Sequence, residues 1–163
     1  MKDRQKLQIV IVSGKKNAGK TKYLQEIRQR AAGKGWDVGG FLSIARWENN
    51  EKSHYFLFDL QNAEEHLLAW KSDKPAALRI GQYELSASAF DWGTNLIRSQ
   101  LHLPVLILDE FGPLEMQEKG WYKALLFLLK HYRGILFISV RPDLLSPLLH
   151  LIKSELNMIV KQT

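Results

Sequence analysis

The stretch Gly14-Lys15-Lys16-Asn17-Ala18-Gly19-Lys20-Thr21 decides the fold of this chain. It matches the pattern G-x-x-x-x-G-K-[ST], in which the glycines let backbone N–H groups wrap around phosphate groups. The lysine of this pattern reaches the β- and γ-phosphates of a nucleotide, and the hydroxyl of the last residue ligates Mg²⁺. The predicted nucleotide-binding residues run one position past the loop: Gly14, Lys15, Lys16, Asn17, Ala18, Gly19, Lys20, Thr21 and Lys22.

The residues on either side of the loop support this interpretation. Leu7 to Val12 is an apolar run with the pattern of a buried parallel strand. After the loop, Leu24, Ile27 and Ala31 recur at helical spacing, and Gly33 and Gly35 supply a stop. The first turn of that helix would point the positive end of its dipole at the phosphates. A strand, a glycine loop and a helix in this order favour a phosphate site over a chance glycine turn.

The second half of the chain alternates apolar runs with helical patterns. Leu103 to Leu108 and Ile135 to Val140 predict two buried strands, and Gly120 to Tyr132 predicts a helix between them. Pro142 suits the first turn of another helix, and Asn157 to Val160 predicts a short last strand. Buried strands that alternate with helices indicate an α/β fold, with a parallel sheet covered on both faces.

The middle of the chain has a different pattern. Val38 to Trp47 and Ser53 to Leu60 are rich in β-forming residues and flank a polar turn, so they predict a hairpin. His66 to Lys71 and Gly81 to Leu85 predict further extended segments, followed by a helix over Ser86 to Gln100. We interpret this region as an antiparallel meander inserted into the parallel core or added to its edge.

Two acidic residues follow the apolar run Leu106 to Leu108. An acidic residue at the carboxyl end of a buried strand fits a magnesium ligand, so Asp109 joins Thr21 as a predicted metal residue. Glu110 can orient or deprotonate an attacking water molecule. The alternative is that this pair merely begins a polar loop.

Arg141 completes the predicted catalytic set, which is Lys20, Glu110 and Arg141. It follows the strand Ile135 to Val140 and should emerge on the phosphate side of the sheet, where it can neutralise charge on the γ-phosphate. A solvated arginine at the start of a helix is the alternative. Glu115 faces the site in one interpretation and is a solvated loop carboxylate in the other.

Length and composition set wider limits. The 163 residues suit a single domain spanning 1–163, and the absence of cysteine excludes disulfides and thiolate metal sites. The charged N-terminal residues lead into an apolar run that is too short for a signal peptide or a membrane span, so we expect a cytoplasmic protein. The net charge of +6 suits a triphosphate site. Nucleic-acid binding is the weaker interpretation, because no dense Lys/Arg run is interleaved with aromatic residues.

The stretch Asp109-Glu110-Phe111-Gly112-Pro113-Leu114-Glu115-Met116 resembles the D-E-I-G-x-M-E-L stretch of the THEP1-like nucleoside-triphosphatase family. Val38 to Phe41 and Gly81 to Leu85 agree with that family in the same order. The resemblance implies a RecA-like P-loop NTPase fold of three layers, mostly parallel with an added antiparallel meander. It also implies Mg²⁺-dependent hydrolysis of ATP, GTP and other nucleoside triphosphates. By position, metal support falls on Asp109 and water activation on Glu110.

The chain departs from the family pattern at two places. Asn17 stands where the family often has a further glycine, and Ser53-His54-Tyr55-Phe56 stands where it commonly has R-x-G-F. These departures bear on turnover rate and base preference rather than on phosphate binding.

Three functions are compatible with these features. The leading hypothesis is a Mg²⁺-dependent phosphohydrolase of broad base specificity, with ATP or GTP as substrate. The second is a small-molecule kinase whose acceptor pocket is walled by Trp36, Trp47 and Tyr55. The third is a nucleotide-binding switch module with little turnover.

Overall fold

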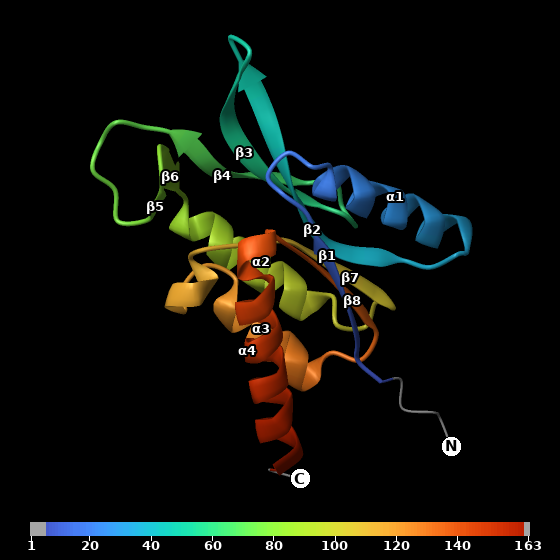
Figure 1. Cartoon of the computed structure of the whole chain (residues 1–163). Helices are drawn as coiled ribbons and strands as arrows, with labels where there is room; N and C mark the ends of the chain where they lie inside the picture. The colour runs from blue at the N-terminus through green and yellow to red at the C-terminus, as the bar shows by residue number, and fades with distance from the viewer. Residues whose placement is uncertain (1–5, 162–163) are drawn as a thin grey trace.

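The computed structural model describes residues 6–161, and Figure 1 shows its helices and strands. The elements and their bounds follow in chain order: β1 (Gln8–Ser13), α1 (Lys20–Gly33), β2 (Val38–Glu48), β3 (Glu51–Asp59), β4 (Glu65–Lys71), β5 (Arg79–Ile80), β6 (Tyr83–Leu85), α2 (Ala87–Ser99), β7 (Val105–Phe111), the 3₁₀ turn η1 (Glu115–Gln117), α3 (Tyr122–His131), β8 (Ile135–Val140) and α4 (Pro142–Lys161).

All eight strands form one mixed sheet in the order β1-β8-β7-β2-β3-β4-β6-β5. The strands from β1 to β2 in this order pair in parallel, and those from β2 to β5 pair antiparallel. Helix α1 covers one face of the sheet, while α2, α3 and α4 lie on the other (Figure 1). The predicted α/β architecture, a parallel core extended by an antiparallel meander, is confirmed.

Strand β7 lies in the middle of the core. Leu106 and Leu108 pack into the cluster under α2 and α3, whereas Val105 and Ile107 pack into the cluster under α1. Both faces of this strand are therefore covered, which explains its uninterrupted apolar sequence. The first predicted carboxylate, Asp109, lies on this strand directly after these apolar residues.

Strands β2 and β7 approach each other unusually closely at Gly40. This residue has φ +85°, and a Cβ atom at its position would lie 2.0 Å from the carbonyl oxygen of Ile107. Any side chain at this position would clash with the neighbouring strand. Gly40 is thus a packing requirement between the two strands.

Strand β1 differs from the prediction in its burial. The segment is a parallel strand, as expected, but it pairs with β8 alone among the described residues. Its residues are exposed or half-buried, and Val10 is 38% exposed. The prediction of a buried strand was wrong, because the apolar run says nothing about where in the sheet the strand lies.

The C-terminal end also differs from the prediction. Asn157 to Val160 lies within α4 rather than forming a last strand. Leu148 and Ile152 on this helix are buried against the core, at the i, i+4 spacing of one helical face. Within residues 6–161, no helix combines the length and the apolarity that crossing a membrane requires.

Candidate active site

The loop between β1 and α1 has the form that its sequence predicts. Gly19 has φ +88°, and α1 begins at the next residue, Lys20. The Lys20 Nζ donates hydrogen bonds to the carbonyl oxygens of Gly14 (2.6 Å) and Lys15 (2.9 Å). These bonds hold the amine across the mouth of the loop, next to the N-terminal turn of the helix, where a phosphate group binds best.

Asn17 explains how the loop tolerates the loss of a family glycine. Its φ is +64°, in the left-handed region that asparagine adopts more readily than other side chains except glycine. Its Oδ1 accepts a hydrogen bond from the Nζ of Lys52, which lies at the start of β3. The β2–β3 hairpin is therefore tied to the phosphate loop by a side-chain contact that glycine cannot make.

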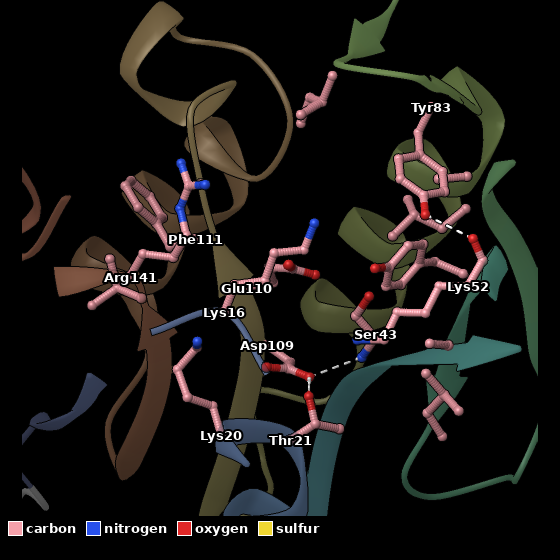
Figure 2. Close-up of a pocket in the computed structure, with 18 of the residues that line it drawn as sticks. Lys16, Lys20, Thr21, Ser43, Lys52, Tyr83, Asp109, Glu110, Phe111 and Arg141 are labelled. Carbon is pink, nitrogen blue, oxygen red and sulfur yellow. Dashed lines mark hydrogen bonds between the residues drawn. The ribbon is translucent and has the colours of Figure 1, made fainter. Parts of the chain in front are cut away.

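Asp109 connects three parts of the chain. Its Oδ2 accepts hydrogen bonds from the Thr21 hydroxyl (2.9 Å) and the Ser43 backbone N–H (3.0 Å), as Figure 2 shows, and its Oδ1 accepts one from the Ser139 hydroxyl (2.5 Å). The residue is 2% exposed. Burial raises the pKa of its carboxyl group, while these hydrogen bonds and the charge of Lys20 act in the opposite direction.

The residues around Asp109 fit a magnesium ion. Neighbouring ligands in a magnesium octahedron lie about 2.9–3.0 Å apart, since its bonds are about 2.1 Å long. The Thr21 Oγ1 and the Asp109 Oδ2 are 2.9 Å apart. In addition, the Ser43 Oγ is buried and has no hydrogen-bond partner among the described residues. Oxygen donors of this kind are the ones that Mg²⁺ prefers.

Glu110 has an unusual backbone conformation for a non-glycine residue. Its φ is +75°, at an irregularity where the register between β7 and β8 shifts. The sequence prediction ended the strand before this carboxylate pair, but β7 continues through it to Phe111. The Glu110 N–H donates a hydrogen bond to the Ser139 Oγ (2.6 Å), which holds the irregular backbone in place. A strained residue of this kind often marks a functional site.

The side chain of Glu110 lines a cavity, as Figure 2 shows. The residue is exposed to the cavity, yet the surrounding walls remove part of its hydration, and this desolvation raises the pKa of its carboxyl group. The negative charge of Asp109 raises the pKa further. The nearby Ser43 side chain, and then the charges of Lys20 and Lys16, partly oppose these effects. A carboxylate with a raised pKa is better suited to accept a proton from a reacting group.

The other predicted residues are placed less centrally. Arg141 lines the cavity beside Phe111 (Figure 2), with its side chain 40% exposed and its Nε 3.7 Å from the Asp143 Oδ1. Six residues of the predicted nucleotide set line the same cavity: Lys16, Asn17, Gly19, Lys20, Thr21 and Lys22. Lys15 is exposed, and the Gly14 carbonyl serves as a partner of Lys20.

Glu115 lines the cavity, in agreement with the interpretation that it faces the site, and it is not the solvated loop carboxylate of the alternative. It is only 4% exposed, and its two carboxylate oxygens accept hydrogen bonds from the backbone N–H groups of Gly112 (2.8 Å) and Trp121 (2.9 Å). Burial raises its pKa to about 7. The residue therefore closes the loop that follows β7 and leads to α3, at the wall of the cavity.

The cavity has a volume of about 640 Å³. One end is formed by the phosphate loop, Asp109 and Glu110, and the other by aromatic and aliphatic side chains of the meander, α2 and the loop after β7. Trp47 and Tyr55 line it, as predicted for an acceptor pocket, whereas Trp36 is 46% exposed and is not among the lining residues. The prediction that Trp36 walls this pocket was wrong, because the residue precedes β2 at the opposite end of that strand.

Three residues of the site were missed in the sequence. Ser43 and Ser139 are polar residues inside otherwise apolar strands, and that interruption was a usable signal. Lys52 gave no such signal, because its contact with Asn17 depends on how the β2–β3 hairpin lies over the loop.

Comparison with known proteins agrees with this geometry. Residues 9–162 match the sequence profile of a family described as NTPase. Nucleoside-triphosphatase THEP1 of Caldivirga maquilingensis is 24% identical over 83% of this chain and 76% of its own length. THEP1 of Pyrococcus abyssi is 27% identical over 77% of this chain and 70% of its own length.

A solved structure gives independent support for the fold. The solution structure of a human cancer-related nucleoside triphosphatase superposes with a TM-score of 0.69, at 18% identity, over 82% of this chain and 76% of that one. At this identity the similarity establishes a shared fold. The profile match, which runs over nearly the whole sequence, establishes more: the chain belongs to the NTPase family.

Proposed function

We propose that this protein is a Mg²⁺-dependent nucleoside-triphosphatase of broad base specificity that releases the γ-phosphate of ATP, GTP and related nucleotides. The observation that carries the proposal is the 2.9 Å hydrogen bond between Thr21 and Asp109. It joins the hydroxyl of the phosphate loop to a strand-end carboxylate, with a second carboxylate, Glu110, next in the chain. The names of the THEP1 relatives support the same reaction.

Binding follows from the loop and the helix behind it. The backbone N–H groups between Gly14 and Thr21 surround the phosphates, and Lys20 exchanges its carbonyl partners for β- and γ-phosphate oxygens. Thr21 and Asp109 would hold Mg²⁺, with Asp109 acting directly or through water. When bound, the ion neutralises charge on the β- and γ-phosphate oxygens.

Chemistry follows from the placement of Glu110. Its carboxylate accepts the proton of a water molecule whose oxygen attacks the γ-phosphorus, while the bond from that phosphorus to the bridging β-oxygen breaks. Arg141 can neutralise charge on the γ-phosphate after leaving Asp143. Most of the rate enhancement in such sites comes from positioning and electrostatics.

The test is phosphate release by the purified protein. ATP, GTP, CTP and UTP are each assayed with Mg²⁺ and with EDTA in place of Mg²⁺. We expect release from all four only with the metal, and we expect Lys20→Ala to lose about 100-fold or more in rate, as removal of one charge-stabilising donor commonly does. The control is Lys34→Ala, which alters an exposed lysine after the C-terminal end of α1. Equal rates for Lys20→Ala and the wild type would contradict the assignment.

A further inference from the structure

We propose that the apolar end of the cavity binds a second ligand, an uncharged aromatic alcohol whose hydroxyl group accepts the γ-phosphoryl group. This inference rests on the nucleotide site proposed above, because the phosphoryl donor is the bound triphosphate. Water takes the place of the alcohol when no such ligand is present.

The floor of this part of the cavity is built by the meander. Ala45, Tyr55, Ala69 and Leu85 are direct cross-strand neighbours on β2, β3, β4 and β6, so they form one row on one face of the sheet. All four line the cavity. Small and large side chains alternate along the row, which leaves space above the two alanines.

The walls of this end are aromatic. Phe90 of α2 lies 4.6 Å from the ring of Trp121, and both line the cavity together with Phe111 of β7. The ring of Tyr83 stands edge-on to Tyr55, with centroids 5.3 Å apart. A hydrolytic water molecule gains nothing from such a surface. An aromatic ring gains both apolar burial and favourable ring-to-ring geometry.

This end of the cavity lies beyond the γ-phosphate. Lys20 contacts the β- and γ-phosphates in sites of this type, and the residue that activates the nucleophile stands at the γ-phosphorus. Glu110 lies between the Lys20–Thr21 end of the site and Tyr83 (Figure 2). The α-phosphate and the sugar therefore extend away from Glu110, and the aromatic end is left for a different molecule.

The charges around this space favour a neutral ligand. An anion would meet the Glu110 carboxylate, while a cation would meet Lys52, whose Nζ is bonded to Asn17 near the mouth. Each Glu115 oxygen already accepts a hydrogen bond from a backbone N–H group, so this carboxyl group is engaged in holding its own loop. A ring with one hydroxyl group directed at Glu110 satisfies these conditions.

The transfer step uses the group already assigned to hydrolysis. The hydroxyl oxygen of the ligand attacks the γ-phosphorus, and a new phosphorus–oxygen bond forms. The bond to the bridging β-oxygen breaks, and the nucleoside diphosphate leaves with that electron pair. The hydroxyl proton passes to the Glu110 carboxylate.

The binding test uses methyl NMR on the full chain with Mg²⁺ and the non-hydrolysable analogue AMPPNP. Benzyl alcohol, 2-phenylethanol and 3-pyridinemethanol are added as probes. We expect at least one probe to shift the methyl signals of Ala45, Ala69 and Leu85, and to leave that of Ala32, an exposed residue on α1, in place. The proposal is overturned if no probe shifts the cavity methyls, or if AMPPNP alone shifts them and excludes every probe.

A variant tests the same site by filling it. Ala69→Leu places a larger side chain on the floor of the cavity, in the space that the probe would occupy. We expect the affinity for the probe to fall about tenfold or more, a loss of the size that overpacking commonly causes. Ala32→Leu makes the same chemical change on the surface and should leave binding unchanged. Thermal unfolding shows whether the Ala69→Leu variant is folded. If it is not, the methyl shifts of the wild type alone decide whether the probe binds in the cavity.

The transfer itself is read by ³¹P NMR with MgATP and the probe that binds. We expect a phosphomonoester signal to grow at the expense of inorganic phosphate. If ADP and inorganic phosphate form without an ester, the transfer step is wrong and the proposed hydrolase stands. If no ADP forms at all, the proposed hydrolase has failed, and the methyl shifts still report whether the second ligand site exists.

Discussion

At the scale of single residues, Ser139 has the most consequential contacts of the site. Its hydroxyl donates to the Asp109 carboxylate and accepts from the Glu110 N–H, so one small side chain holds both members of the acidic pair. The left-handed backbone of Glu110 is costly for a residue with a side chain. Ser139 is thus a positioning residue that fixes where the Glu110 carboxylate points.

Ser139→Ala tests that role. The variant leaves the partly buried Glu110 N–H and the buried Asp109 Oδ1 without this partner, so we expect a loss of about 1–3 kcal/mol in the free energy of unfolding. We also expect kcat for phosphate release to fall about tenfold, with KM little changed, because Glu110 loses its fixed position while the phosphate loop remains intact. Ser139→Thr should restore most of the rate. Ser99→Ala is the control, since Ser99 makes an exposed bond to a helix carbonyl. A fall in stability without a change in kcat would refute the positioning role.

Glu115 predicts a pH dependence of stability. Its folded-state pKa is about 7, above the ordinary value of 4.5. The unfolded chain therefore loses this proton between pH 4.5 and 7 while the folded protein keeps it, and the free energy of unfolding falls by about 3 kcal/mol over that window. The free energy of unfolding, measured with urea at pH 5 and at pH 7.5, should fall in this way for the wild type. In Glu115→Gln the part of the fall that comes from this carboxyl group should be absent. Parallel pH profiles for the two proteins would rule it out.

At the scale of elements, the β2–β3 hairpin does more than extend the sheet. Asn49 and Asn50 both take the left-handed conformation of a tight hairpin turn, and the strand that follows begins with Glu51 and Lys52. Lys52 then reaches back to Asn17, so the hairpin and the phosphate loop restrain each other. The position of the loop depends partly on an element from elsewhere in the chain.

Lys52→Ala should separate the hairpin from the loop. We expect KM for MgATP to rise several-fold, because the loop loses a restraint that prepares it for phosphate, while an exposed contact of this kind changes global stability by about 1 kcal/mol or less. Steady-state kinetics and thermal unfolding measure the two effects. The control is Lys71→Ala, which removes an exposed lysine paired with Glu51. If both variants raise KM equally, a general loss of positive charge explains the result and the Lys52–Asn17 contact does not.

The elements also show what the sequence could and could not predict. The strand Ile135–Val140 was predicted to the residue, and the predicted stop at Gly33 and Gly35 coincides with the end of α1, because apolar periodicity and glycine stops are local signals. The two-residue strand β5 was missed, since it is too short to carry a period. The exposure of β1 was missed because strand order is a property of the whole sheet.

For the site, too, the sequence predicted some residues and missed others. Lys20, Thr21, Asp109 and Glu110 were found from motifs, and the structure brings them to one cavity. Ser43, Ser139 and Lys52 contact them from β2, β8 and β3, and no local pattern records these long-range contacts. Motifs thus identified the residues proposed for the chemistry, while tertiary structure was needed to find the residues that hold them.

At the scale of the whole molecule, the sheet divides the cavity into two chemical halves. The parallel strands bring the phosphate loop and the carboxylate pair together at their carboxyl ends, as parallel α/β sheets generally do. The antiparallel strands continue the same surface as an apolar floor. One continuous sheet therefore places a polar, anion-binding region beside a water-excluding one, with Glu110 between them.

The half-exposed β1 has a consequence for the dynamics of the molecule. This strand carries the phosphate loop, yet its backbone is anchored on one side alone within the described residues. Strands of this kind open by local fluctuation more readily than central ones. Amide hydrogen exchange should therefore be faster in β1 than in β7, and MgADP should slow it in β1 in particular. Uniform protection across both strands would contradict this. Nucleotide binding would then stabilise β1 against local unfolding, and β1 is the strand that leads into the nucleotide-binding loop itself.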